Sequence, residues 1–294
     1  MRFLITSDMH FRDTVPQARK DDYVEEMFRK LEWLLDLQEE TGTKILDGGD
    51  MFHSWKSSNY LLNRLIRTFQ KHNPNGLAFC TIPGNHEMPS HNINYLNKSS
   101  LMVLDAARAI DVLLGQDEDI EGIPYGGASA GANVSRVVLV HEMVYNPAIE
   151  TLPPGVVGIT HTKMFNQFPD AELIISGHNH KSFVVRNQGQ TLINPGSLMR
   201  SNADQKDHKP TVYLYEDGKV TPIPVPINRD VWDTAYLEKQ HARDARIEAF
   251  VKKVGGKDFE LSGSFENNLK SYFKKNKTRK GVVQKVEEAV HGIK

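Results

Sequence analysis

The chain has 294 residues, of which 36 are Lys or Arg and 37 are Asp or Glu, and 39% of its residues are hydrophobic. This balance and a mean hydropathy of −0.47 are typical of a globular protein with one large domain, or with one large and one smaller domain. They argue against a membrane protein, because no segment is apolar for long enough to cross a bilayer and residues 3–5 form too short an apolar run for a signal peptide. The single Cys80 cannot form an internal disulfide, so we expect a cytoplasmic location.

The first third of the chain alternates predicted strands with predicted helices. Strands are expected at residues 2–7, 44–46 and 77–82, and helices at 21–40, from the N-cap Ser58 onward, and near 99–108. Cys80 lies inside the third apolar run, and we interpret it as a buried core residue rather than a metal ligand or nucleophile. The alternation of strands and helices predicts an α/β fold.

From residue 111 the pattern changes to short apolar runs separated by turn residues. Strands are expected at 112–114, 137–140, 173–176, 183–186, 191–194 and 212–215, with a hairpin turn at Asp217 and Gly218. The prolines at 222–226 restrict that stretch to an edge strand or a linker. We therefore predict one domain over residues 1–226 and a basic, mainly helical region over 227–294.

The C-terminal region is basic, with 14 Lys and Arg against 7 Asp and Glu from Lys239 to the end. Residues 270–280 contain no acidic side chain at all. This run could contact phosphate groups of a nucleic acid, but it could equally be the solvated face of a helix.

Carboxylate, amide and imidazole side chains follow the predicted strands. They are Asp8, His10, Asp50, Asn85, His141, His178 and His180. Because the ends of neighbouring strands meet at one edge of a sheet, these side chains can be directed at a single point. A mixed nitrogen and oxygen donor set without sulfur suits Mn, Fe or Zn better than Ca.

Two divalent cations need one ligand that reaches both, and a carboxylate is suited to that position. We assign this bridge to Asp50, which follows two glycines. Asp8, His10 and His180 are assigned to the first cation, and Asn85, His141 and His178 to the second. His86 adjoins a predicted ligand and is a candidate to protonate the leaving oxygen, with His53 as a candidate to orient the phosphate.

Each of these motifs is weak evidence by itself, since an isolated Asp-x-His or Gly-Asp is usually only a turn. Their order and spacing together resemble the five sequence blocks of the calcineurin-like metallophosphoesterases. Residues 49–54 and 194–200 are also similar to segments of the nuclease subunit of SbcC–SbcD type DNA repair complexes. The compact chain would suit a phage-encoded version of that subunit.

The resemblance implies a four-layer α/β/β/α sandwich, here with a small helical C-terminal appendage, and two divalent metal ions. The ions would be Mn, with Mg, Fe or Zn as alternatives. It further implies exonuclease or endonuclease action on DNA, an SMC-like ATPase as partner, and a homodimer as one possible assembly. Two alternatives stay open: a phosphoesterase for a small-molecule or protein substrate, and a scaffold whose metal site has lost its activity.

Overall fold

The computed structural model describes residues 1–72, 78–128, 135–153, 155–228, 231–239, 242 and 272–283. They divide into two compact units, one of residues 1–152 and 157–234 and the other of residues 153–156 and 235–294. In the second unit the described residues include short helical stretches at 272–275 and 280–283. Most of the predicted C-terminal helical region lies outside the described residues, so that prediction stays a prediction.

Within the described part of the first unit, one sheet has six strands in the order β14-β13-β1-β2-β3-β4. The bounds are β1 Arg2–Thr6, β2 Lys44–Asp47, β3 Phe79–Thr81, β4 Asp111–Val112, β13 Thr211–Glu216 and β14 Lys219–Pro224. Strands β1 to β4 run parallel, whereas β13 is antiparallel to β1. The proline-containing β14 lies at the edge, as predicted, because proline cannot donate to a second neighbouring strand.

A second sheet has the order β11-β12-β10-β7-β6-β5. The bounds are β5 Gly115–Asp117, β6 Ile120–Ile123, β7 Val137–His141, β10 Leu173–Gly177, β11 Phe183–Asn187 and β12 Gln190–Asn194. Its four central strands β6, β7, β10 and β12 run parallel. A small parallel pair, β8 Val144–Tyr145 and β9 Ile159–Thr160, lies outside both sheets.

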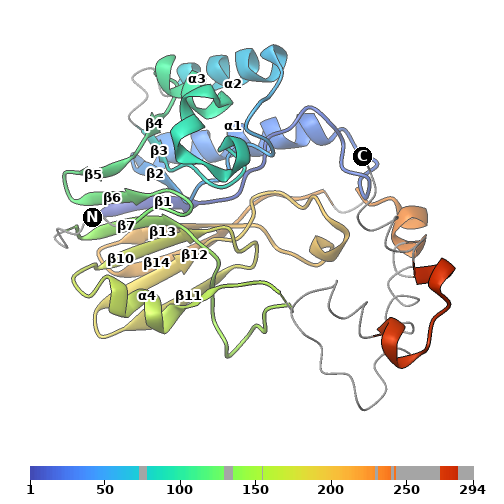
Figure 1. Ribbon diagram of the computed structural model, residues 1–294. Helices are drawn as coiled ribbons and strands as arrows, with labels where there is room; N and C mark the ends of the chain where they lie inside the picture. Colours follow the sequence, from blue (N-terminus) through green and yellow to red (C-terminus); the bar gives the residue numbers. More distant parts are fainter. Residues whose placement is uncertain are drawn as a thin grey trace. The chain divides into compact units, whose positions relative to one another are not determined.

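Helices cover the outer face of each sheet (Figure 1). The α-helices are α1 Tyr23–Thr41, α2 Asn59–His72, α3 Ser100–Ala106 and α4 His161–Gln167, and the 3-10 turns are η1 Pro89–His91, η2 Ile93–Lys98 and η3 Ala203–Gln205. Helices α1 to α3 share a buried apolar cluster with the first sheet, and α4 shares another with the second.

A third apolar cluster joins the facing sides of the two sheets, with Ile5 and Leu46 from one sheet and Leu139 and Ile175 from the other. Every described layer therefore buries an apolar face against the next, and the order is helices, sheet, sheet, helix. This arrangement confirms the predicted α/β/β/α sandwich. Cys80 is 1% exposed in this core, where burial raises the pKa of its thiol to about 12, in line with the interpretation as a core residue.

Helix α1 shows why the sequence pattern predicted the helices that cover the first sheet. The Asp22 side chain accepts a hydrogen bond from the Glu25 amide at the helix start, and Gly42 ends the helix with a left-handed φ of 62°. Several elements were not predicted, among them the strands β5, β6, β8 and β9 and the helix α4. Helix α4 has only seven residues, and β5 is a short polar strand without an alternating apolar pattern.

Candidate metal centre

The predicted site residues come from strand ends in both sheets. Asp8 and His10 follow β1, Asp50 follows β2, and Asn85 and His86 follow β3 in the first sheet. His141 is the last residue of β7, and His178 and His180 follow β10 in the second sheet. Because β1, β2 and β3 run parallel to one another, and β7 runs parallel to β10, the carboxyl ends of these strands lie at one edge within each sheet.

Hydrogen bonds hold the two sheets together at this edge. The His178 amide of the second sheet donates to the Asp8 carboxylate of the first sheet at 3.2 Å, and the Asp8 amide donates to the Gly49 carbonyl within the first sheet at 2.9 Å. The His141 Nδ1–H donates to the Gly48 carbonyl at 2.7 Å. The strand-end loops therefore position one another, and all nine predicted residues lie in one region of the first unit.

The backbone here adopts conformations that are uncommon for residues with a Cβ. Asp8, His10, Asp50 and His178 have φ values of 53°, 50°, 53° and 73°, in the left-handed region. Such conformations are energetically unfavourable and persist where the surrounding structure enforces them, often at functional sites. Each of them points a side chain in a direction that ordinary strand geometry would not give.

The first group of donor atoms comprises Asp8, His10 and His180, which lie close enough together to hold one cation. His10 Nε2 is 3.1 Å from His180 Nε2, and Asp8 Oδ1 lies 3.8 Å from the former and 3.6 Å from the latter. His10 Nδ1 is buried without a hydrogen-bond partner among the described residues. Two ring nitrogens and a carboxylate oxygen thus face one small volume.

The second group comprises Asp50, His141 and His178, with Asn85 beside it. His141 Nε2 lies 3.3 Å from Asp50 Oδ2 and 3.2 Å from Asn85 Oδ1. Asp50 Oδ2 is also 3.9 Å from His10 Nε2 of the first group. Asp50 is therefore adjacent to both groups, as expected for a bridging carboxylate.

The hydrogen bonding of His141 tests whether this donor set fits a cation. A carbonyl oxygen can only accept, so the proton of the neutral ring sits on Nδ1, where it meets the Gly48 carbonyl. His141 Nε2 then presents a lone pair toward two oxygen acceptors, which is a repulsive arrangement without a positive charge among them. A divalent cation or a second ring proton resolves it, so the residues fit a metal ion.

The pKa values follow from burial and from the crowding of these groups. Burial opposes protonation of His141, but the Asp50 and Asp8 carboxylates outweigh it and raise its pKa to about 10. Burial acts against the charge of Asp50 as well, yet the neighbouring histidines, His141 first, hold its pKa below the usual value. Burial raises the pKa of Asp8 and lowers that of His178 to about 4.

His86 and His53 adjoin the first group of donors. The His86 Nδ1–H donates to the His53 carbonyl at 2.7 Å, which leaves Nε2 directed toward the site at 3.9 Å from Asp50 Oδ2. The His86 amide also donates to Asp50 Oδ1 at 3.0 Å. The rings of His10, His53 and His86 lie close to one another, with centroids 4.8 Å to 6.1 Å apart.

Sequence reasoning missed two buried carboxylates beneath the site. Glu87 is fully buried and accepts hydrogen bonds from the Phe52 amide at 2.6 Å and from the Gly84 amide at 2.8 Å. Asp47 accepts from the Thr81 hydroxyl at 2.6 Å and from the Gly49 amide. Glu87 therefore links the loop that carries Asp50 to the loop that carries Asn85. Asp47 links the loop that carries Asp50 to strand β3. The sequence offered one indication of both residues, because Glu87 directly follows the Gly-Asn-His motif and Asp47 lies two residues before the Gly-Asp motif.

Arg12 was also missed, although it lies two residues after His10. Partial burial, reinforced by the charge of the Arg12 guanidinium, lowers the pKa of His53 to about 4. The guanidinium donates to the neutral Thr14 hydroxyl at 3.0 Å and 3.1 Å. This cation stands close to the phosphate-orienting position predicted for His53.

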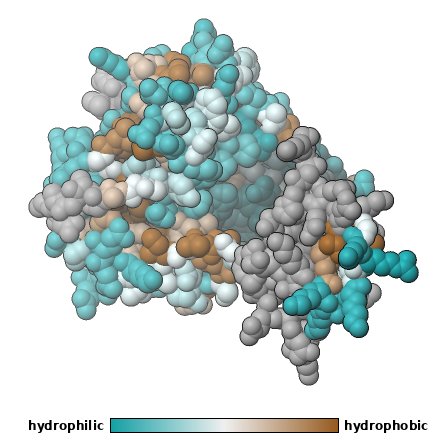
Figure 2. All heavy atoms as spheres, in the orientation of Figure 1, coloured by the Kyte–Doolittle hydropathy of each residue, from teal (hydrophilic) through white to brown (hydrophobic). Residues whose placement is uncertain are grey.

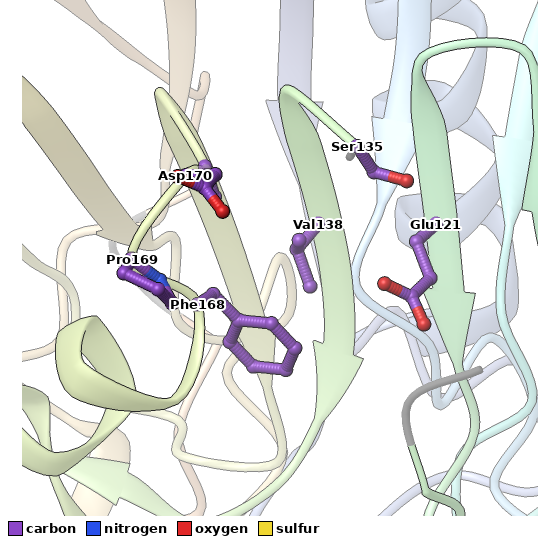
Figure 3. A pocket seen from close by; sticks show the side chains of 7 residues that line it. Glu121, Ser135, Val138, Phe168, Pro169 and Asp170 are labelled. Atoms are coloured by element: carbon purple, nitrogen blue, oxygen red, sulfur yellow. The ribbon is translucent and has the colours of Figure 1, made fainter. Parts of the chain in front are cut away.

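A separate small pocket lies on the second sheet (Figure 3). It is lined by Glu121 of β6, Ser135 before β7, Val138 of β7 and residues 168–171 between α4 and β10. None of the predicted site residues lines it. We therefore place the functional site at the strand ends.

Comparison with protein families matches residues 1–182 to the calcineurin-like phosphoesterases. The chain belongs to this family. It is therefore a metal-dependent hydrolase of phosphoester bonds, and the donor groups described above are its candidate metal-binding residues. No helix within the described residues has the length and apolar character that a membrane span requires.

Several solved structures resemble this phosphoesterase. A protein from Thermus thermophilus is 13% identical, with a TM-score of 0.48 over 76% of this chain and 99% of that chain. An archaeal phosphodiesterase is 13% identical, with a TM-score of 0.42 over 76% of this chain and all of that chain, 100%. A predicted phosphoesterase from Streptococcus pneumoniae is 11% identical, with a TM-score of 0.36 over 79% of this chain and 91% of that chain. A search of curated proteins gave no match.

Proposed function

We propose that this phosphoesterase is a two-metal nuclease that hydrolyses phosphodiester bonds of DNA. The observation that carries the proposal is the position of Asp50 Oδ2, which lies within reach of His10, His86 and His141 ring nitrogens at 3.9 Å, 3.9 Å and 3.3 Å. One carboxylate shared by two donor groups is the arrangement that a pair of adjacent cations requires.

Asp8, His10, His180 and Asp50 would hold the first cation. Asp50, Asn85, His141 and His178 would hold the second. When bound, such ions would polarise the phosphoryl group and make a water molecule a stronger nucleophile. Mn suits this nitrogen and oxygen donor set, with Mg, Fe or Zn as alternatives.

His86 would supply the proton for the leaving oxygen. Its Nδ1–H is held by the His53 carbonyl, so the ring orientation is fixed and Nε2 faces the site. When Nε2 also carries a proton, the ring can donate it to an oxygen of the scissile phosphate. Arg12 and His53 stand beside this position and would bind the non-bridging phosphate oxygens, since a guanidinium is well suited to phosphate.

DNA as the substrate is supported by charge outside the metal centre. Within its described residues, the C-terminal segment carries the exposed cations Lys274, Lys275, Lys277, Arg279 and Lys280. Such cations bind the phosphate backbone without sequence preference, and this binding weakens steeply as salt is added. An SMC-like ATPase partner and a homodimer remain predictions from the family resemblance.

Cleavage of defined substrates tests the proposal. The protein should cut single- or double-stranded DNA with Mn or Mg and should lose this activity when a chelator is present. It should also hydrolyse bis(p-nitrophenyl) phosphate faster than p-nitrophenyl phosphate, since a nuclease acts on diesters. A preference for the monoester, without cleavage of either DNA, would instead support a phosphoesterase of small molecules or proteins.

Substitution of His86 tests the assigned proton donor. His86→Ala should retain its metal ions but lose turnover by about 100-fold or more, which is the usual contribution of a general acid. His72→Ala is the matched control, because His72 hydrogen-bonds to Glu39 on the helical layer at 2.8 Å, outside the donor groups. A His86→Ala protein as active as His72→Ala would exclude this role for His86.

A further inference from the structure

Tyr125 lies beside the second donor group and is not explained by metal binding or by proton transfer. Its ring centroid is 5.5 Å from that of His178 and 6.3 Å from that of His141. On another side the ring contacts His91, with centroids 5.9 Å apart. Tyr125 is half-buried and His91 is exposed, so this pair of rings reaches from the candidate ligands to the protein surface.

The backbone fixes the position of Tyr125 firmly. The Tyr125 amide donates to the Pro83 carbonyl at 3.1 Å, which ties the end of β6 to the loop after β3. The Gly127 amide closes a turn onto the Pro124 carbonyl at 2.8 Å, and Gly126 within it has a φ of 66°. These bonds position the backbone of Tyr125, and the contacts with His91 and His178 locate its ring beside the second donor group. A ring that is positioned before binding reduces the entropy lost when a substrate binds.

The two ends of the donor set are flanked by different ring pairs. His53 and His86 adjoin the first group through His10, whereas His91 and Tyr125 adjoin the second group through His178. His86 carries a catalytic assignment, since its Nε2 faces the scissile position. The His91–Tyr125 pair has no catalytic assignment, although it adjoins the second donor group as His53 and His86 adjoin the first.

We propose that the His91–Tyr125 pair is a stacking subsite for a nucleobase of the substrate. The inference rests on the proposed function, because it concerns what is esterified to the phosphate held at the same metal centre. A nucleobase offers a flat π-face that stacks on tyrosine and histidine rings irrespective of its identity. Stacking requires a base that is free of its duplex neighbours, so the subsite favours single-stranded DNA and frayed ends over duplex DNA.

A pair of chromogenic diesters isolates the contribution of the base. The first is the p-nitrophenyl ester of thymidine 5′-phosphate, and the second is the same ester of an abasic deoxyribose 5′-phosphate. They share the leaving group, the phosphate and the sugar, and they differ only in the thymine. The wild-type protein should have a kcat/KM about tenfold higher for the thymidine ester, as expected for one stacked base.

Tyr125→Ala should reduce this preference to nearly one, with the change residing in KM rather than kcat. Tyr125→Phe should keep the preference, because the phenyl ring stacks as well as the phenol. His91→Ala should reduce it partly. Tyr60→Ala is the control and should keep the full preference, since Tyr60 lies on α2 with 69% of its surface exposed.

Two results would overturn the stacking subsite. One is a wild-type protein that hydrolyses both esters with equal kcat/KM. The other is a Tyr125→Ala protein that loses activity on both esters by the same factor together with metal affinity, measured by isothermal titration with Mn. That second result would make Tyr125 a positioning residue that supports His178.

The two proposals fail in distinguishable ways. If neither ester is hydrolysed with Mn or Mg, the phosphodiesterase function itself is wrong. If both esters are hydrolysed but the ratio does not respond to Tyr125→Ala, only the stacking subsite is wrong. If the ratio responds but no DNA is cut, the base-binding subsite stands and the substrate is a smaller nucleotide diester.

Discussion

Lys30 is a buried cation outside the metal centre. Its Nζ donates to the Leu198 carbonyl at 2.8 Å, and its side chain is 2% exposed. Burial, reinforced by the charges of Arg200 and Arg19, lowers the pKa of Lys30 to about 7. The unfolded chain should keep an ordinary lysine pKa near 10.4, so it binds more protons than the folded chain between about pH 7 and pH 10.

Folding stability should therefore rise with pH through this window because of Lys30. The contribution is at most about 1.4 kcal/mol per pH unit, and Lys30→Met should remove it. Chemical denaturation of both proteins at pH 7, 8 and 9 would measure the effect. The unfolding free energy of Lys30→Met should fall relative to that of the wild-type protein as pH rises. A stability difference that is constant across these pH values would contradict the lowered pKa.

Glu87 acts on the metal centre through the backbone of two loops. Both of its oxygens accept amide protons, from Phe52 in the loop after β2 and from Gly84 in the loop after β3. Glu87→Gln keeps the shape but replaces one acceptor with a donor, which would leave a buried amide without its partner. Such a group destabilises by about 1–3 kcal/mol.

The predicted result for Glu87→Gln is a loss of about that size in unfolding free energy and a weaker affinity for Mn. Denaturation and isothermal titration would measure the two quantities. Glu142→Gln is a suitable control, because Glu142 is the neighbour of His141 in sequence and has no such pair of amide donors among the described hydrogen bonds. Unchanged Mn affinity in Glu87→Gln would show that the two loops do not need this link.

At the scale of secondary structure, the strand-end loops leave room for the donors only because glycines occupy close contacts. A Cβ on Gly84 would overlap Asp50 Oδ1, and one on Gly177 would overlap the Gly48 carbonyl oxygen. Gly49 has a φ of 95°, and its Cβ would lie 2.7 Å from His141 Nδ1. The glycines thus decide how closely the two sheets approach at the metal centre.

Gly49→Ala and Gly189→Ala form a matched pair for this point. Gly189 has a similar φ of 92°, but a Cβ there would meet nothing within 4 Å. Gly189→Ala should lose about 1–2 kcal/mol through backbone conformation alone, whereas Gly49→Ala should lose several times more and nearly all phosphodiesterase activity. Thermal melts and diester hydrolysis would measure both. Equal effects at the two positions would mean that the contact with His141 is unimportant.

For the molecule as a whole, the metal centre joins the two sheets. Donors from β1, β2 and β3 face donors from β7 and β10, so bound cations would link one layer of the sandwich to the other. Figure 2 shows hydrophilic side chains over most of the visible face of the first unit, with apolar side chains in small separate groups. Within the described residues, the inner apolar cluster and the hydrogen bonds from His141 to Gly48 and from His178 to Asp8 link the two sheets, and bound cations would add to this linkage.

Removal of the cations should lower the melting temperature. Saturation at about 100 times the dissociation constant stabilises the folded state by about 2.7 kcal/mol, which corresponds to several degrees. Differential scanning calorimetry with Mn and with excess chelator would measure the shift. Asp50→Asn should show a much smaller response, because it lacks the shared carboxylate. If the melting temperature of the wild-type protein is the same with Mn and with chelator, the protein does not bind the cation.

The sequence alone determined the donor types, their order along the chain and the alternation that predicts an α/β fold, and the family resemblance added the sandwich architecture. Apolar spacing, the cap Ser58 and turn glycines are local signals, so they can be interpreted without coordinates. Only the tertiary structure decided which donors face each other, because His10 and His180 meet through the packing of two sheets rather than through sequence spacing. Glu87, Arg12 and Tyr125 gain their roles in the same way, from neighbours contributed by other strands.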